Sequence, residues 1–234
     1  MTKTTTSLQL DDISISVIRS KKRKTMALQI RDDQVLLRIP ARLPMALANR
    51  FIQEKKHWIQ QTLANKTPSE KKQFTNGELF RFLDQKLPLN IIFAKRNKVY
   101  LENQTLIVET KVSEPSYLQL SKWITNWYRQ QADEYLADRF ALISKQLDFS
   151  PRSLTIKSYK ARWGSCAING AIQLNWKLIM APVDIIDYVI IHELCHLQHH
   201  NHSSQFWGLV THFYPDYQQA RTWLKKHGHT LTID

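Results

Sequence analysis

The chain has 234 residues, of which 43% are hydrophobic, and a formal net charge of +13 at pH 7. This length suits one large or two small domains, and the hydrophobic content favours a packed globular protein over a disordered one. No apolar stretch approaches the roughly 20 residues of a membrane span, and residues 1–15 contain no apolar signal core. With two cysteines and no disulfide framework, the sequence predicts a cytoplasmic protein that does not contact membranes.

The positive charge is concentrated in the first half of the chain. Residues 1–115 carry 21 Lys and Arg against 11 Asp and Glu, whereas residues 116–234 carry 12 against 9. A basic surface of this kind attracts polyanions such as nucleic acid or phosphorylated substrates. A solvated surface that keeps the protein soluble explains the same charge equally well, so both interpretations stay open.

Strand signals dominate the first 40 residues. Apolar residues alternate with polar ones over residues 7–39, and Asp32-Asp33 is expected to be the turn of a hairpin. The basic segment Arg19–Lys24 interrupts this pattern. It is interpreted as an exposed connection between strands, with phosphate contact as the alternative.

The remainder of the first half contains one helix and more strands. Residues 44–64 have helical spacing of apolar side chains, and residues 65–72 are polar and predict a linker or loop. Strand signals return over residues 74–110, with turns expected at Asn76-Gly77 and Asn103-Gln104. We therefore expect residues 1–115 to form a β-rich basic unit with one helix.

The second half begins after Glu114-Pro115, where a domain boundary is expected. An amphipathic pattern predicts one long helix from Tyr117 to about Leu147. Two short strands, 151–157 and 172–175, are expected on either side of a loop at 162–170. Three further helices follow, namely an apolar helix after Pro182, a helix over 204–212 and a helix from Pro215 to Lys226. The fold class is thus α+β, with helices and a small sheet expected over residues 116–234.

The apolar helix after Pro182 carries the sequence His192-Glu193-Leu194-Cys195-His196. Residues four apart lie on the same face of a helix, so His192 and His196 can bind one metal ion together. Glu193 stands beside them and is placed to act as general base on a water. Two imidazoles and a carboxylate on so apolar a helix are costly to bury without a partner, and a metal supplies one.

A third protein ligand is needed, and His202 is the best candidate. His199 and His200 lie too far along the helix axis, about 10 Å beyond His192 at ~1.5 Å per residue. Asn201 is expected to adopt the left-handed conformation that ends a helix and turns the chain back. Three histidines leave one position open, which is typical of catalytic zinc.

Several segments carry a resemblance to a known family. They are Arg162–Cys166 (RWGSC), Ile172–Asn175 (IQLN), Ala181-Pro182 and His192–Trp207, and they occur in this order. This series resembles the YgjP-like family of zinc metallopeptidases, which is related to the SprT-like proteases. The resemblance covers most of the chain and implies a zinc-dependent hydrolase with a minimal zincin-like domain. Metzincins share the histidine spacing but carry Gly where this chain has His199, so that assignment is rejected.

Residues outside the motif are candidates for binding substrate or stabilising an oxyanion. Arg162, Trp163 and Ser165 form either a structural turn against the metal helix or part of the substrate site. Asn175 is either a residue that pairs with backbone or a contact in the substrate groove, and Tyr214 is a further candidate oxyanion donor.

The sequence therefore predicts a zinc metallopeptidase that cleaves polypeptides, with His192, His196 and His202 on Zn²⁺ and Glu193 as general base. The first alternative is a metal-dependent phosphohydrolase of nucleotides, of the nucleoside triphosphate pyrophosphatase type, favoured by the basic first half. The second is a nucleic-acid-binding module with a vestigial metal site. The presence of Glu193 argues against this module, because a structural site does not need that carboxylate.

Overall fold

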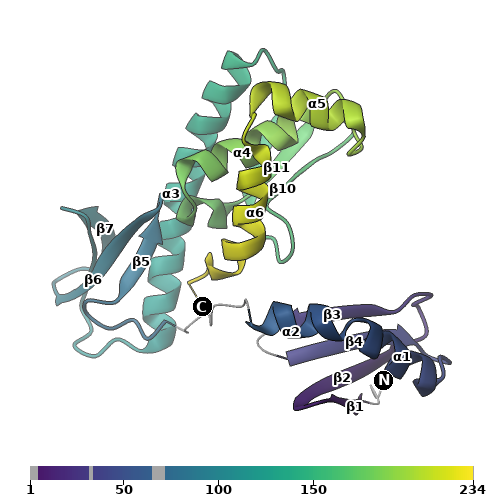
Figure 1. The fold of residues 1–234 in the computed structure, drawn as a ribbon. Helices are drawn as coiled ribbons and strands as arrows, with labels where there is room; N and C mark the ends of the chain where they lie inside the picture. The colour runs from purple at the N-terminus through teal and green to yellow at the C-terminus, as the bar shows by residue number, and fades with distance from the viewer. Residues whose placement is uncertain (1–4, 32–33, 65–71, 234) are drawn as a thin grey trace. The chain divides into compact units, whose positions relative to one another are not determined.

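The computed structural model describes residues 5–31, 34–64 and 72–233, and the chain divides into two compact units, Met1–Pro68 and Ser69–Asp234 (Figure 1). The helices and sheets of both units confirm the α+β class. The division differs from the boundary expected at residue 115. Strands over residues 79–110 share one hydrophobic core with the long helix that follows them, so Pro115 marks a local break inside the second unit.

Unit 1 consists of a four-stranded sheet followed by two helices. Its sheet has the order β1-β2-β4-β3, in which β2 and β4 run parallel. Side chains such as Val17, Leu37 and Ile52 form its core together with both helices. The elements are β1 (Thr5–Leu10), β2 (Ile13–Ser20), β3 (Ala27–Arg31), β4 (Gln34–Pro40), α1 (Met45–Glu54) and α2 (Lys56–Ala64).

Two local details of unit 1 differ from the expectation. The alternating stretch at the start forms two strands, because Asp11 adopts a positive φ of 51° and turns the chain. The single helix expected over residues 44–64 is two helices, which are separated at Lys55. The turn expected at Asp32-Asp33 and most of the linker expected over residues 65–72 lie outside the described residues.

Unit 2 begins with a second four-stranded sheet, of order β5-β6-β8-β7. Its expected turns are confirmed, since Gly77, Asn103 and Gln104 all have positive φ. The long helix α3 (Tyr117–Gln146) then packs against this sheet, with Ser116 and Gln119 forming a capping box at its start. The strands are β5 (Leu79–Phe82), β6 (Gln85–Phe93), β7 (Lys98–Glu102) and β8 (Thr105–Thr110).

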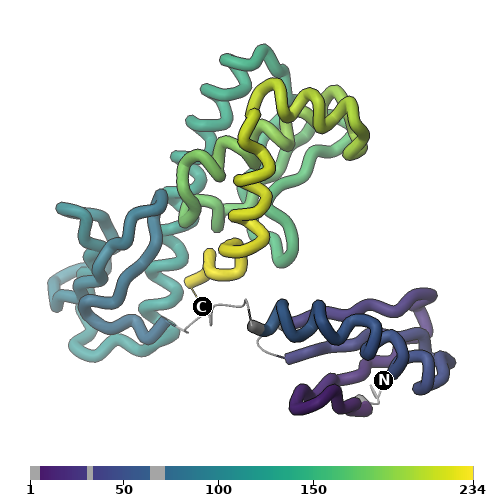
Figure 2. Tube along the Cα trace, viewed as in Figure 1, coloured from purple at the N-terminus to yellow at the C-terminus, as the bar shows by residue number. Residues whose placement is uncertain are grey.

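The remaining elements surround the helix that carries the histidine motif. A three-stranded sheet has the order β10-β11-β9, and its short strand β10 lies inside the segment expected to be a loop. Figures 1 and 2 show α4 between this sheet and the C-terminal helices. The elements are β9 (Ser153–Lys157), β10 (Gly164–Cys166), β11 (Ala171–Asn175), the 3-10 helix η1 (Trp176–Met180), α4 (Val183–Cys195), α5 (Ser204–Phe213), α6 (Tyr217–His227) and the 3-10 helix η2 (Gly228–Thr230).

Helix α4 lies in the core of unit 2. It is tied to α3 by an ion pair in which the Arg139 guanidinium donates to both carboxylate oxygens of Asp187. Its apolar side chains, including Ile186, Ile190 and Leu194, are fully buried. Within the described residues, no helix combines the length and the apolar character required to cross a bilayer.

Candidate metal centre

The histidine motif occupies the last turn of α4. Val183 to Ile191 contains mostly apolar residues, and burial of this stretch on several sides fixes the helix in the core. His192 lies in the last turn, and His196 is the residue that caps the helix. The packing of an apolar helix thus carries two imidazoles and one carboxylate to the edge of the core.

The chain turns after α4 and brings His202 back to the motif. The turn is not made as expected, because Asn201 is absent from the residues with positive φ. Instead, the Asn201 side-chain oxygen accepts a hydrogen bond from the Ser203 backbone N–H at 3.2 Å. Ser203 then caps α5, as its hydroxyl accepts from the Phe206 backbone N–H at 3.4 Å.

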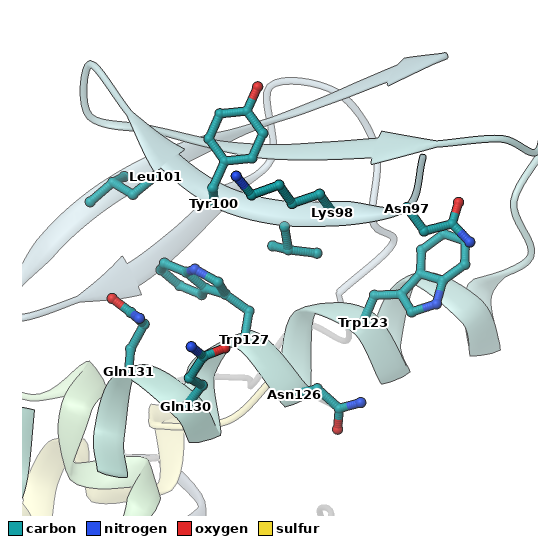
Figure 3. Close-up of a pocket in the computed structure, with 10 residues that line it drawn as sticks. Asn97, Lys98, Tyr100, Leu101, Trp123, Asn126, Trp127, Gln130 and Gln131 are labelled. Atoms are coloured by element: carbon teal, nitrogen blue, oxygen red, sulfur yellow. The ribbon is translucent and has the colours of Figure 1, made fainter. Parts of the chain in front are cut away.

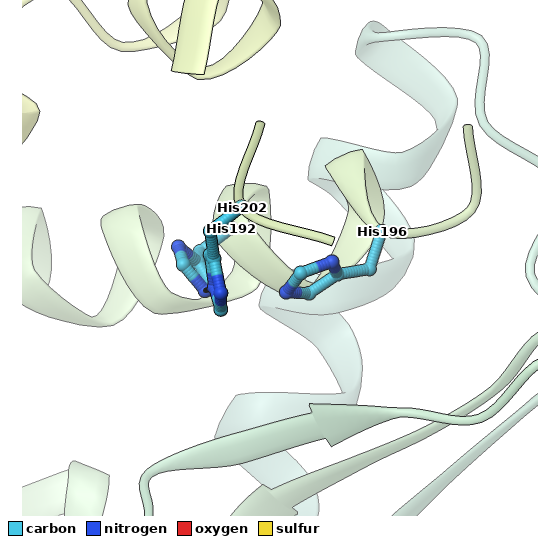
Figure 4. Close-up of side chains that lie close together, drawn as sticks. All are labelled: His192, His196 and His202. Atoms are coloured by element: carbon cyan, nitrogen blue, oxygen red, sulfur yellow. Dashed lines mark hydrogen bonds between the residues drawn. The ribbon is translucent and has the colours of Figure 1, made fainter. Parts of the chain in front are cut away.

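The three histidine side chains lie together in Figure 4. Each offers a ring nitrogen, and these atoms all lie within 4.8 Å of one another. The Nε2 atoms of His192 and His202 are 3.2 Å apart. Nitrogens that bind a tetrahedral zinc at about 2.0–2.1 Å lie about 3.3–3.4 Å apart, so this pair has the required spacing. The donor set therefore fits a zinc-sized ion.

Hydrogen bonding and burial prepare these histidines to bind a cation. His196 Nδ1 lies 2.9 Å from the backbone oxygen of His199, so Nδ1 carries the proton and Nε2 is left with a free lone pair. Burial lowers the pKa of His192 to about 3 and also lowers the pKa of His196. Neutral imidazole is the form that binds a metal, so both side chains are in the required state near neutral pH.

Glu193 is placed in an apolar environment beside the histidines. Its side chain is buried at 6% exposure. This burial raises the pKa of Glu193 to about 8, although the positive charge of Arg162 acts in the opposite direction. A carboxyl group whose pKa lies near neutrality can both take up and release a proton, which general acid–base chemistry needs.

Phe206 and Trp207 support the histidine rings, a role that the sequence did not indicate. The buried Phe206 ring has its centroid 4.4 Å from that of His196, 5.0 Å from His192 and 4.9 Å from His202. Trp207 stacks on His202 at 5.5 Å. The Ser203 cap sets the start of α5 and therefore the position of both rings. Ser203 is thus the feature of the sequence that could have indicated this role for Phe206 and Trp207.

Asn175 connects the Arg162–Cys166 segment to the sheet. Its backbone N–H donates to the Trp163 carbonyl at 2.8 Å, and its side-chain amide donates to the carbonyls of Arg162 and Tyr159 at 3.0 and 3.2 Å. Its side-chain oxygen accepts from the Lys177 backbone N–H. Asn175 is only 3% exposed. The structure thus places this residue as an internal anchor for the segment.

The other candidate contact residues have different surroundings. The Ser165 hydroxyl lies 3.2 Å from the Tyr159 hydroxyl, which itself donates to the Gln173 side-chain oxygen. Arg162 is exposed, and its charge acts on Glu193. The Tyr214 hydroxyl donates to the Asp184 carbonyl at 3.0 Å. Arg162 is therefore the candidate whose side chain is both exposed and close enough to influence the general base.

A separate groove lies on the other side of unit 2. It has a volume of about 550 Å³ and runs between β7 and the first half of α3, where Trp123 and Trp127 line it (Figure 3). Amide side chains such as Asn126 and Gln130 complete the lining. None of the lining residues belongs to α4 or α5. The histidine cluster is instead open to solvent at the exposed His202.

Comparisons with known proteins place this chain in a family. No curated protein matches the chain. Among solved structures, the metallopeptidase zymogen abylysin of Pyrococcus abyssi is 23% identical, with 38% of this chain and 93% of that chain covered and a TM-score of 0.35. The metallopeptidase domain of the YgjP-like family matches residues 24–227. The chain therefore belongs to the YgjP-like metallopeptidase family, as its motifs indicated.

Proposed function

We propose that this protein is a zinc-dependent peptidase in which His192, His196 and His202 hold the ion and Glu193 is the general base. The observation that carries the proposal is the convergence of three imidazole nitrogens beside a buried carboxylate. Zinc, when bound, supplies a Lewis acid that polarises a carbonyl group and makes water more acidic. A polypeptide is the proposed substrate.

The residues of the chain perform the proton transfers. Glu193 accepts a proton from the attacking water at its carboxylate and then delivers it to the leaving amine. In the metal-free protein the apolar surroundings raise the pKa of Glu193, which favours the protonated form that the second transfer needs. The exposed Arg162 is proposed to contact the substrate near this carboxylate, with Trp163 and Ser165 forming the adjacent wall.

The test compares wild type with Glu193→Gln for zinc content and for cleavage of an unfolded protein such as casein. The variant keeps the size of the side chain and should retain zinc, while cleavage should fall by about 10²–10⁴-fold. His212→Gln is the matched control, because His212 lies on α5 and outside the histidine cluster. Wild-type cleavage by Glu193→Gln would contradict the proposal.

The same proteins separate peptidase activity from the alternatives. Nucleoside triphosphate hydrolysis that is lost in Glu193→Gln, without any peptide cleavage by wild type, would favour the phosphohydrolase. Equal behaviour of the two proteins in both assays would leave a binding module with a vestigial metal site.

We also propose that unit 1 binds polyanions, with nucleic acid as the partner class. Residues 1–68 contain 13 Lys and Arg against 5 Asp and Glu. Within Arg19–Lys24, Arg19 serves the fold, since its guanidinium donates to the Ala41 and Leu43 carbonyls at 2.8 Å. Lys21, Lys22 and Lys24 are exposed and are the side chains that support phosphate contact.

This partner is tested by DNA binding of the full chain at several salt concentrations. Changing Lys21, Lys22 and Lys24 to Glu should weaken binding and reduce the slope of log K against log salt by about 2–3. The control changes the exposed Lys86, Lys95 and Lys122 of unit 2 to Glu, an equal change in net charge. Equal loss in both triple variants would show that only the net charge of the chain matters and would contradict the proposal.

A further inference from the structure

The Glu193 carboxylate is held in place without hydrogen bonds. It is buried, yet no group in the described part of the chain donates a hydrogen bond to it. Buried carboxylates are normally fixed by such donors, and a general base needs its carboxylate oxygens to point toward the proton that they accept. Packing contacts are therefore the means by which the described part of the chain can orient this side chain.

Gly164 on β10 provides such a contact. A Cβ atom built on Gly164 would lie 2.6 Å from both Cγ and Oε1 of Glu193, and 2.8 Å from Cδ. Real Cβ atoms essentially never approach other atoms this closely. The φ angle of Gly164 lies outside the left-handed region, so its backbone does not itself require glycine. Glycine is needed here because the Glu193 side chain fills the space of a Cβ.

The backbone on either side of Gly164 is firmly held. Gly164 pairs with Leu174 between β10 and β11. The preceding carbonyl, of Trp163, accepts the Asn175 backbone N–H at 2.8 Å. The Trp163 ring in turn lies against Gly228, where an added Cβ would be 2.8 Å from Cζ2. These contacts hold Gly164 more firmly than the end of the Glu193 side chain is held, so an added methyl group would displace the carboxylate more readily than the strand.

We propose that Gly164 is a positioning residue for the general base, and this inference rests on the proposed peptidase function. Its bare Cα, held by β11 and Asn175, fixes the direction of the Glu193 carboxylate at the histidine cluster. The conformation of a strand three residues long therefore controls the proton transfers made by a helix residue 29 positions later in the chain.

The first test is Gly164→Ala in the full chain. Displacement of the base by about 1 Å should lower kcat by about 10²-fold, with little change in KM. Zinc stoichiometry and the visible spectrum of the cobalt-substituted protein should stay as in wild type, because the three atoms nearest to the added Cβ all belong to Glu193 and none to a histidine. Gly208→Ala is the matched control, since a Cβ on this exposed α5 glycine meets nothing within 4 Å, and it should keep wild-type kinetics.

A double-mutant cycle shows whether Gly164 acts through Glu193. Added to Glu193→Gln, Gly164→Ala should cause no further loss, because the displaced group is already unable to accept a proton. An equal fold-loss in both backgrounds, loss of zinc, or wild-type kcat in Gly164→Ala would overturn the inference. Wild-type activity of Glu193→Gln would instead overturn the peptidase function itself.

A second variant keeps the inference testable if Gly164→Ala does not fold. Gly228→Ala places a methyl group against the Trp163 ring and shifts Gly164 indirectly. It should give the same pattern with a smaller effect, namely a lower kcat, retained zinc, and no effect in the Glu193→Gln background. Wild-type kcat in Gly228→Ala, when Gly164→Ala is unfolded, would overturn the inference.

Discussion

The two four-stranded sheets of this protein share one topology but serve different purposes. Both have the order first, second, fourth, third, with the two central strands parallel and the outer pairs antiparallel. In unit 1, α1 and α2 cover the sheet and complete a core of their own. In unit 2, α3 covers the sheet and continues into a larger core that contains α4. The same arrangement of strands thus forms a core of its own in unit 1, whereas in unit 2 it supports the helix that carries the histidines.

The cores of the two units also differ in polarity. Among the described residues, the buried polar or charged side chains are Thr110, Ser144, Asn175 and Glu193, and all four belong to unit 2. Burial of an unpaired carboxyl group is costly. In unit 2 this cost falls on the residue next to His192, whereas among the described residues of unit 1 the buried polar atom without a partner is Arg38 Nε.

The largest expected effect concerns the pH dependence of stability in the metal-free protein. The folded pKa of Glu193 is about 8, above its ordinary value of 4.5, so folding takes up a proton between these pH values. The contribution of Glu193 to the free energy of unfolding therefore falls as pH rises, by at most about 1.4 kcal/mol per pH unit. Below about pH 6.5 the lowered pKa values of His192 and His196 contribute in the opposite direction, so the net fall is expected between about pH 6.5 and 8. Glu193→Gln should remove this slope, and urea unfolding across pH in the presence of a chelator measures it. An unchanged slope in the variant would show that Glu193 is not the group whose protonation causes the pH dependence of the unfolding free energy.

The next largest effect is expected when the Phe206 ring, which packs against the three histidines, is removed. Phe206→Ala should lower the unfolding free energy by about 3–5 kcal/mol and weaken zinc binding by about 10–100-fold. Phe140→Ala is the matched control, because this buried α3 side chain lies in the same core, whereas the ring contacts of the three imidazoles include Phe206. Competition with a zinc chelator distinguishes the two variants. Equal zinc affinity in both would mean that Phe206 serves stability alone.

The smallest expected effect on the site comes from the other core. Leu37→Ala in unit 1 should cost about 2–5 kcal/mol in the stability of that unit, because Leu37 is fully buried. Zinc affinity and kcat should be unchanged, since Leu37 belongs to a separate core. Calorimetry should show one transition shifted and one retained. Weaker zinc binding in Leu37→Ala would contradict the separation of the two units.

Local patterns in the sequence predicted much of the site. The His192 and His196 spacing identified the reactive end of α4, and the helix expected over residues 204–212 is α5 (Ser204–Phe213). The long helix was also expected at its observed position, from Tyr117 to about Leu147. These features depend on residues a few positions apart, so a single sequence contains enough information to find them.

Features that depend on distant contacts were missed. The boundary expected at residue 115 was displaced, because membership of a unit depends on packing between strands and α3 and not on the local break at Pro115. Strand β10 has three residues and exists through its pairing with β11. The contact between Gly164 and Glu193 joins two segments that only the folded chain brings together.

The most direct measurement is X-ray absorption at the zinc edge of the purified full chain, with zinc content determined on the same sample. The three-histidine site predicts about one zinc per chain, with three imidazole nitrogens at about 2.0–2.1 Å and one further oxygen ligand. His202→Gln should lose one imidazole from this shell. Absence of zinc, or a sulfur ligand near 2.3 Å from Cys195 or Cys166, would contradict the metal centre on which the proposed function depends.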